Sequence, residues 1–167
     1  MTMELYIIRH GIAADKEAYT NDAERPLTEK GIKQTGKVAK QLHSGGLRFD
    51  LILTSPLVRA KETAVILQEA ELCSQVEENS SLAPDGNIKD WVNWLQDVWQ
   101  NPPQDRCLAL VGHQPNLGIW AETLVWGYAK EKLILKKAGV IGLKIPSTGT
   151  PIGESELFLL TSPKWLL

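Results

Sequence analysis

Short apolar segments alternate with longer amphipathic segments along most of the chain. The apolar segments predict buried β-strands at Glu4–Ile8, Leu51–Thr54, Cys107–Val111, Val140–Ile145 and Glu156–Leu160. The amphipathic segments predict helices over Thr28–Leu42, Leu57–Leu72, Ile88–Trp99 and Leu117–Tyr128. Strands that alternate with helices are typical of an α/β domain. We therefore expect a three-layer α/β fold with a largely parallel central sheet and helices on both of its faces.

Length and composition limit the classes of protein to be considered. The 167 residues suit a single domain over 1–167, and 43% hydrophobic with 23% charged residues is typical of a globular protein. A formal net charge of -2 argues against nucleic acid as a partner. No apolar run approaches the roughly 20 residues that span a bilayer, so no membrane association is expected. The apolar stretch Leu5–Ile8 is too short for the core of a signal peptide, and the two cysteines favour a cytoplasmic protein.

Several familiar catalytic and cofactor motifs are absent from the sequence. Neither Cys73 nor Cys107 stands in a C-x5-R motif, which argues against a cysteine-nucleophile phosphatase. Neither of the glycine-rich nucleotide-binding motifs, G-x-x-x-x-G-K-[ST] and G-x-G-x-x-G, occurs. The three histidines have no metal-ligand spacing, so we expect no structural metal and no cofactor.

Charged and imidazole side chains follow three of the predicted strands. The first strand runs into Arg9-His10-Gly11, the second is followed by Arg59, and the Cys107–Val111 strand is followed by Gly112-His113. Ligands of α/β sheets bind beyond the carboxyl ends of parallel strands, where these side chains would meet. Two guanidinium groups can bind a phosphoryl group, and an unprotonated imidazole can attack its phosphorus. Taken singly, each residue could be a surface ion-pair or helix-end residue, but their joint occurrence favours a phosphate pocket.

Three motifs in a fixed order carry a resemblance to a known family. They are R-H-G at 9–11, S-P-x-x-R-A-x-x-T at 55–63 and G-H-x-P at 112–115. With them the chain resembles the histidine phosphatase superfamily, which has the phosphoglycerate mutase-like fold. Within it, R-P-L-T-x-x-G at 25–31, L-x-P-x-G at 82–86 and S-P-K-W-L at 162–166 are similar to the short SixA-type phosphohistidine phosphatases.

This resemblance implies a role for each residue of the predicted pocket. His10 would be the nucleophile that forms a covalent phosphohistidine intermediate, and Arg9, Arg59 and His113 would complete the catalytic phosphate pocket. Arg25 would be an additional phosphate-binding arginine. The alternative for Arg25 is a loop salt bridge with Asp22 or Glu24.

The sequence departs from larger members of the family in one respect. Mutases and sugar phosphatases carry a carboxylic acid that protonates the leaving oxygen, whereas no carboxylate here matches that role. Asp85 is the nearest candidate acid, with Asp15 and Glu24 behind it, but Asp85 before Gly86 also suits a simple turn. A missing acid is tolerable for phosphohistidine, because its P–N bond is labile and an imidazole leaves readily.

These features favour a metal-independent phosphatase acting in signal transduction on phosphohistidine in a partner protein, such as a phosphotransfer domain. The chain is shorter than the mutases, whose insertions cap the pocket, so an open site suited to a protein side chain is expected. One alternative is a small-molecule phosphomonoesterase or sugar-phosphate phosphatase on the same scaffold. The other is a non-catalytic phosphate-binding module. A monomer is expected.

Overall fold

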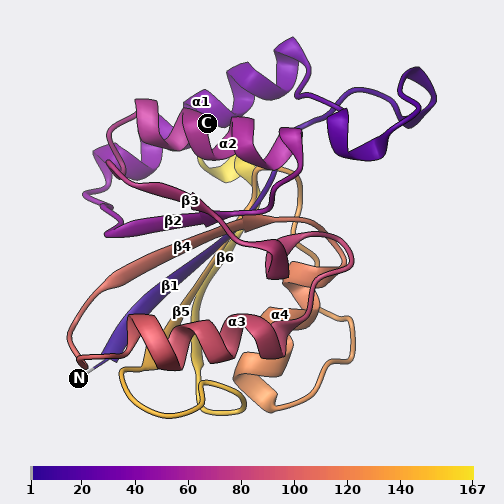
Figure 1. Cartoon of the computed structure of the whole chain (residues 1–167). Helices are drawn as coiled ribbons and strands as arrows, with labels where there is room; N and C mark the ends of the chain where they lie inside the picture. Colours follow the sequence, from indigo (N-terminus) through magenta and orange to yellow (C-terminus); the bar gives the residue numbers. More distant parts are fainter. Residues whose placement is uncertain (1) are drawn as a thin grey trace.

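The computed structural model describes residues 2–167 and is built around one six-stranded sheet in the order β3-β2-β4-β1-β5-β6 (Figure 1). The strands are β1 Thr2–Arg9, β2 Leu51–Thr54, β3 Val76–Glu78, β4 Cys107–Gly112, β5 Val140–Pro146 and β6 Glu156–Thr161. The helices are α1 Glu29–Ser44, α2 Val58–Glu69, α3 Ile88–Trp94 and α4 Asn116–Trp126. A π-helical segment, Leu95–Trp99, extends α3, and the remaining helical turns are short 3-10 segments.

The five predicted strands and the four predicted helices are all present. Helix α1 begins as the sequence indicates, because the Thr28 side chain accepts a hydrogen bond from the Gly31 N–H and caps it. The edge strand β3 was not predicted. It has three residues, of which Val76 alone is apolar, so it carries neither the alternation nor the apolar run that marks a strand.

The direction of the strands confirms a largely parallel sheet. Strand β1 is parallel to β4, and β2 is parallel to both β4 and β3. Strand β5 is antiparallel to β1 and to β6, so it alone runs against the others. The register pairs Arg9 with Gly112 and Thr54 with Val111. The carboxyl ends of β1, β2 and β4 therefore reach the same edge of the sheet.

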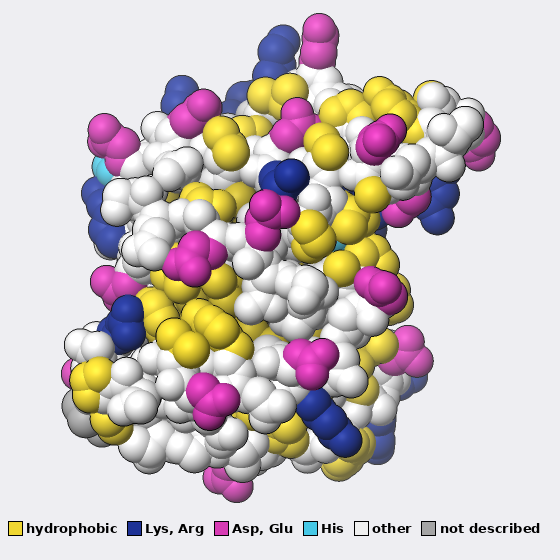
Figure 2. Space-filling model, viewed as in Figure 1, with side chains coloured by type: hydrophobic (Ala, Val, Ile, Leu, Met, Phe, Trp, Pro, Cys, Tyr) yellow, Lys and Arg dark blue, Asp and Glu magenta, His cyan; other side chains and the backbone are white. Residues whose placement is uncertain are grey.

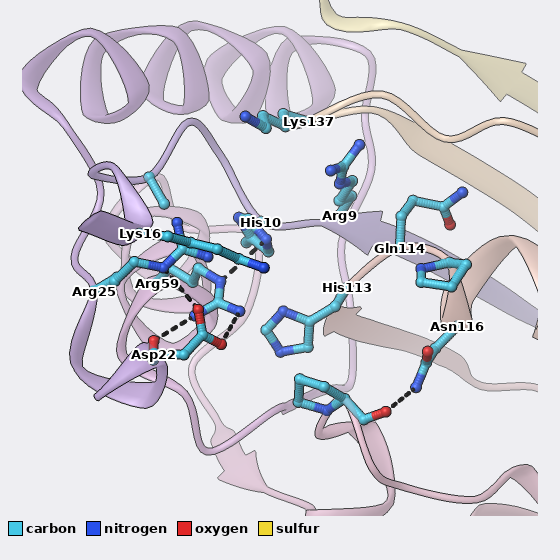
Figure 3. A pocket seen from close by; sticks show the side chains of 13 residues that line it. Arg9, His10, Lys16, Asp22, Arg25, Arg59, His113, Gln114, Asn116 and Lys137 are labelled. Carbon is cyan, nitrogen blue, oxygen red and sulfur yellow. Dashed lines mark hydrogen bonds and ion pairs between the residues drawn. The ribbon is translucent and has the colours of Figure 1, made fainter. Parts of the chain in front are cut away.

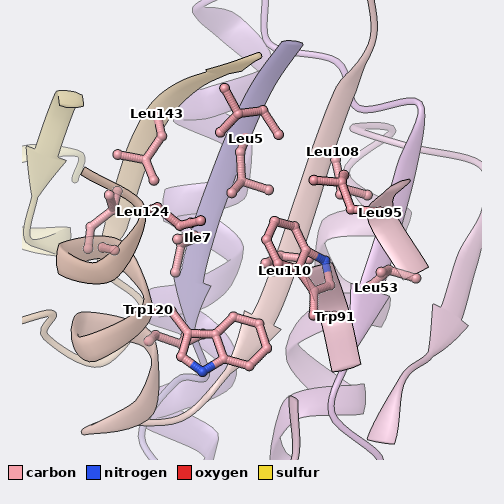
Figure 4. Packing of buried hydrophobic residues seen from close by; sticks show 14 of the residues in the cluster. Leu5, Ile7, Leu53, Trp91, Leu95, Leu108, Leu110, Trp120, Leu124 and Leu143 are labelled. Carbon is pink, nitrogen blue, oxygen red and sulfur yellow. The ribbon is translucent and has the colours of Figure 1, made fainter. Parts of the chain in front are cut away.

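Two hydrophobic cores cover the two faces of the sheet and explain its three layers. Alternate residues of β1 point to opposite faces, with Leu5 and Ile7 in one core and Tyr6 and Ile8 in the other. The first core packs α3 and α4 against the sheet, and Trp91 and Trp120 contact each other within it (Figure 4). The second core packs α1 and α2 against the opposite face (Figure 1).

The described chain has no helix that could span a membrane, and one face of its surface mixes side chains of both charges. In the described chain no helix is long and apolar enough to cross a bilayer. Acidic and basic side chains are interspersed over the face drawn in Figure 2, with apolar side chains between them. This mixture agrees with the small net charge of -2.

Candidate active site

His10 stands directly after β1, at the edge where the three parallel strands end. Its backbone N–H donates to the carbonyl of Gly112 across the sheet (3.0 Å), and its side chain is buried. The next residue, Gly11, lies so close to α1 that an added Cβ would collide with the hydroxyl of Thr35. The Gly11 N–H also donates to Thr63 Oγ1 of α2 at 3.1 Å. These contacts explain why glycine follows the histidine and fix the start of the loop.

Hydrogen bonds define which nitrogen of His10 carries the proton. Nδ1 lies 2.7 Å from the carbonyl oxygen of Gly11, which can only accept, so Nδ1 is the protonated nitrogen. Nε2 accepts a hydrogen bond from the Nε–H of Arg59 at 3.3 Å. Burial lowers the pKa of His10 to about 3. The hydrogen bond to the Gly11 carbonyl acts to raise this pKa, but the neighbouring His113, Arg59 and Arg9 lower it further. At neutral pH the ring is therefore uncharged and presents a lone pair at Nε2.

His113 stands directly after β4, with its ring centroid 5.1 Å from that of His10. Its Nε2 lies 2.7 Å from Ser55 Oγ, a hydroxyl at the end of β2. Its Nδ1 is buried and has no hydrogen-bond partner. Burial lowers the pKa of His113 to about 4, with Arg59 as the next largest contribution, so this ring is also neutral at pH 7.

Three arginines line the same cavity as the histidines and come from three different parts of the chain. Arg9 is the last residue of β1 and donates from Nη1 to the carbonyl of Leu135 at 3.0 Å. Its Nε is buried without a partner. Arg59 is the second residue of α2 and is buried beside His10. Arg25 lies in the loop before α1 and donates from Nη1 to the carbonyl of Ala14 at 2.7 Å.

Asp22 connects two of these arginines and is a site residue that the sequence did not single out. One carboxylate oxygen accepts from Arg25 Nε at 2.8 Å, and the other accepts from Arg59 Nη2 at 3.1 Å. Its backbone carbonyl accepts from Arg59 Nη1 at 2.8 Å. Partial burial acts to raise the pKa of Asp22, but the hydrogen bonds and charges of the two arginines outweigh it and lower that pKa. Arg25 therefore both lines the pocket and forms the salt bridge considered as its alternative.

The side chains enclose a cavity of about 410 Å³ (Figure 3). It is lined by all five of the predicted phosphate-site residues, Arg9, His10, Arg25, Arg59 and His113. Two further cations, Lys16 and Lys137, line it as well. Among the described residues that line the cavity, Asp22 carries the sole carboxylate. The cavity thus suits a small, strongly anionic group.

The candidate acid Asp85 lies elsewhere. It is exposed, sits in the turn after the short helical segment Ser80–Leu82, and does not line the cavity, although its neighbour Pro84 does. The sequence motif around it has a local structural reason, because a Cβ at Gly86 would collide with the carbonyl of Ser81. Within residues 2–167, no group of three or more His, Cys, Asp or Glu side chains is arranged to hold a metal ion.

Comparison with known proteins relates this site to a family. Residues 5–84 match the model of the histidine phosphatase superfamily (branch 1), a range that includes His10 and Arg59. An uncharacterized protein of Picosynechococcus sp. is 51% identical over 166 residues, covering 99% of both chains. The chain belongs to the histidine phosphatase superfamily.

Two further proteins that are similar to this chain differ in what their names describe. The adenosylcobalamin/alpha-ribazole phosphatase of Escherichia coli (strain K12) is 35% identical over 104 residues, which is 59% of this chain and 50% of that enzyme. The protein histidine phosphatase SixA, solved in complex with tungstate, superimposes with a TM-score of 0.85 over 99% of this chain and all of SixA. At 23% sequence identity, SixA shows that the fold is shared.

Proposed function

We propose that this member of the superfamily is a phosphatase that removes the phosphoryl group from phosphohistidine in a partner protein, through a phosphorylated His10. Membership of the superfamily supports phosphatase activity in general. The observation that carries the proposal is the state of His10, a neutral imidazole that lines a cavity with five cationic side chains and whose unprotonated Nε2 is bonded, among the described residues, only to the Nε–H of Arg59. A nucleophile and the charges that stabilise a phosphoryl group thus share one site.

In the first step, the Arg59 Nε–H leaves His10 Nε2 for a phosphoryl oxygen, and the freed lone pair attacks the phosphorus and forms a new P–N bond. The P–N bond of the substrate breaks, and its electron pair stays on the leaving imidazole. That imidazole departs as a neutral ring when its second nitrogen carries a proton. Arg9, Arg59 and Arg25 offset the charge of the three phosphoryl oxygens, which is the main contribution a protein makes to phosphoryl transfer. In this role the arginines supply positive charge without a metal ion.

In the second step, water attacks the phosphorus of phospho-His10. The bond between phosphorus and Nε2 breaks, and inorganic phosphate leaves with the water oxygen. The electron pair returns to Nε2, and the ring regains its starting state because Nδ1 stays bonded to the carbonyl of Gly11 throughout. The nucleophile is therefore ready for another turnover without a change of tautomer.

The absence of a usable acid among the described residues that line the cavity favours phosphohistidine as the substrate. Asp22 is the sole carboxylate there, and its low pKa keeps it ionised and paired with Arg25 and Arg59. An ionised carboxylate cannot protonate an alkoxide leaving group. An imidazole leaving group needs less help, so the site suits P–N cleavage. SixA, a structure with the same fold, is named as a protein histidine phosphatase.

A second candidate function is hydrolysis of a small phosphate ester. The observation in its favour is the 35% identity to a phosphatase named for adenosylcobalamin and alpha-ribazole, which extends over 59% of this chain. The same nucleophile and arginines would serve both reactions. The two functions differ in the leaving group, and that difference can be measured.

The test compares two substrates with matched variants. A phosphohistidine-bearing phosphotransfer domain and p-nitrophenyl phosphate are each incubated with wild type, His10→Ala and His43→Ala, with chelator present. His43 lies in the last turn of α1 and does not line the cavity, so its variant controls for loss of a histidine. We expect rapid loss of phosphohistidine that requires His10 and is unaffected at His43.

Other outcomes would redirect or overturn the proposal. Slow loss of phosphohistidine with fast, His10-dependent turnover of a small ester would support the second candidate. Turnover that persists in His10→Ala would show that His10 is not the nucleophile. No turnover of either substrate, with retained binding of phosphate, would favour a non-catalytic phosphate-binding module.

A further inference from the structure

A buried hydroxyl lies directly behind the second histidine of the pocket. Ser55 follows β2 and is fully buried, with its backbone N–H bonded to the carbonyl of Val111 on β4 at 2.9 Å. The backbone N–H of Leu57 donates to Ser55 Oγ at 3.2 Å. His113 Nε2 lies 2.7 Å from the same Oγ. Ser55 is separated from His113 by 58 residues, and the pairing of β2 with β4 brings the two together.

The position of the hydroxyl proton follows from counting donors and acceptors. A serine hydroxyl has one proton to donate and two lone pairs that accept. The N–H of Leu57 uses one lone pair of Ser55. The only acceptor that the described residues offer to the proton is Nε2 of His113. The hydroxyl is therefore satisfied when it donates to Nε2, and a buried hydroxyl that donates nowhere is costly.

This assignment determines what His113 presents to the cavity. If Nε2 accepts from Ser55, the single proton of the neutral ring is on Nδ1. Nδ1 is buried and has no partner in the protein, while the residue itself lines the cavity beside His10. A buried N–H without a partner is unusual and marks a place that a ligand atom can occupy.

We propose that Ser55 is a positioning residue that holds His113 as the Nδ1–H tautomer, so that the pocket offers a neutral N–H donor to a phosphoryl oxygen. The identity of the bound oxygen rests on the proposed function, whereas the tautomer is a property of the free protein. In the opposite tautomer a lone pair on Nδ1 would face an anionic oxygen and repel it. Ser55 acts through His113 and does not itself touch the phosphoryl group.

The test combines spectroscopy of the free protein with kinetics. Nitrogen-15 NMR of the histidine rings distinguishes the two neutral tautomers, and His113→Gln assigns the signals. We expect Nδ1–H at His113 in wild type and a shift toward Nε2–H in Ser55→Ala. We also expect kcat/KM for p-nitrophenyl phosphate to fall on the order of 10-fold in Ser55→Ala, the effect of one misplaced hydrogen bond. Ser55→Thr, which keeps the hydroxyl, should restore the wild-type tautomer and most of the rate.

Thr54→Val is the matched control for a merely structural effect. Thr54 is also buried, and its hydroxyl donates to the carbonyl of Ser55 at 3.1 Å without touching His113. We expect Thr54→Val to leave the His113 tautomer unchanged. A wild-type spectrum with the proton on Nε2 of His113 would overturn the inference even if Ser55→Ala does not fold. An unchanged tautomer in a folded Ser55→Ala would overturn it as well. A tautomer shift in a protein without phosphatase activity would instead reject the proposed function and leave this inference intact.

Discussion

The ends of β1 and β4 each carry a buried, neutral histidine, and the two rings lie 5.1 Å apart. The chemistry that we assign to them is opposite. At the end of β1, His10 turns its protonated nitrogen to the protein and its lone pair to the cavity. At the end of β4, His113 turns its accepting nitrogen to Ser55 and a free N–H to the cavity. One ring can attack phosphorus, while the other can hold an oxygen.

The two tautomers are held by different kinds of partner. The proton of His10 is bonded to the carbonyl of the next residue, Gly11, so the required state is built into the local backbone. The state of His113 depends on a side chain from β2, and only the folded sheet supplies it. The proton position of His10, the proposed nucleophile, thus depends on the backbone, whereas that of His113, the proposed donor, can be changed by substitution of Ser55.

The largest expected effect comes from replacing His10, the proposed nucleophile. In His10→Gln no ring nitrogen is available to attack, so turnover of p-nitrophenyl phosphate should fall on the order of 10⁴-fold or more. No phosphorylated protein should form. Intact mass after an alkaline quench, which preserves the P–N bond, measures the intermediate. A phosphorylated species in this variant would place the nucleophile on another residue.

Removal of the second histidine should have a smaller effect of a different kind. His113→Gln loses one donor to the phosphoryl group, and loss of one such donor costs on the order of 10² to 10³ in kcat. The phosphorylated intermediate should still form, although slowly. The same quench and mass measurement on both variants separates the two roles. If His113→Gln formed no intermediate over long incubation, it would be wrong to assign the attack to His10 alone and only oxygen binding to His113.

The neutral state of both rings predicts how stability depends on pH. In the unfolded chain a histidine has a pKa near 6.5, whereas burial lowers the folded values to about 3 for His10 and about 4 for His113. Between pH 6.5 and about 4 the unfolded chain therefore binds more protons, and stability is lost as the pH falls. From pH 7.5 to 4.5, each histidine should contribute on the order of 2 kcal/mol to that loss.

Denaturant titrations at the two pH values measure this loss. In His10→Gln and in His113→Gln the decrease on acidification should be smaller than in wild type. His43→Gln serves as the control, because it removes a histidine outside the cavity. A decrease of equal size in all four proteins would show that the two rings are not held neutral by the fold.

The smallest effect is expected from substitution of Asp22, which lies on the His10 side of the pocket. Its half-exposed carboxylate occupies N–H groups of Arg25 and Arg59 that an oxyanion could use. Because the carboxylate of each pair is open to solvent, we expect each pair to be worth about 1 kcal/mol or less. In Asp22→Asn the inhibition constant of tungstate should therefore decrease by roughly 2- to 10-fold. Weaker inhibition would mean that Asp22 orients the arginines more than it competes with the ligand.

The sequence predicted five of the six strands and the main residues of the cavity because these features are local. Apolar runs mark β1, β2 and β4, and each motif at a strand end can be read without knowledge of the rest of the chain. The roles of those residues remain proposals. Asp22 was weighed only as a loop salt-bridge partner, because its link to Arg59 of α2 spans 37 residues and leaves no local pattern. The tautomers depend on hydrogen bonds that form only when the strands pair, as the contact between Ser55 and His113 shows.

The cavity lies at one end of the parallel strands, so a label or a tether can be attached at the other end without blocking it. The segment 101–105 is exposed and precedes β4, whose six residues extend about 20 Å before His113 is reached. A fluorophore or a surface tether attached there would leave the mouth of the cavity open. Immobilised in this orientation, the molecule would present the mouth of the cavity outward.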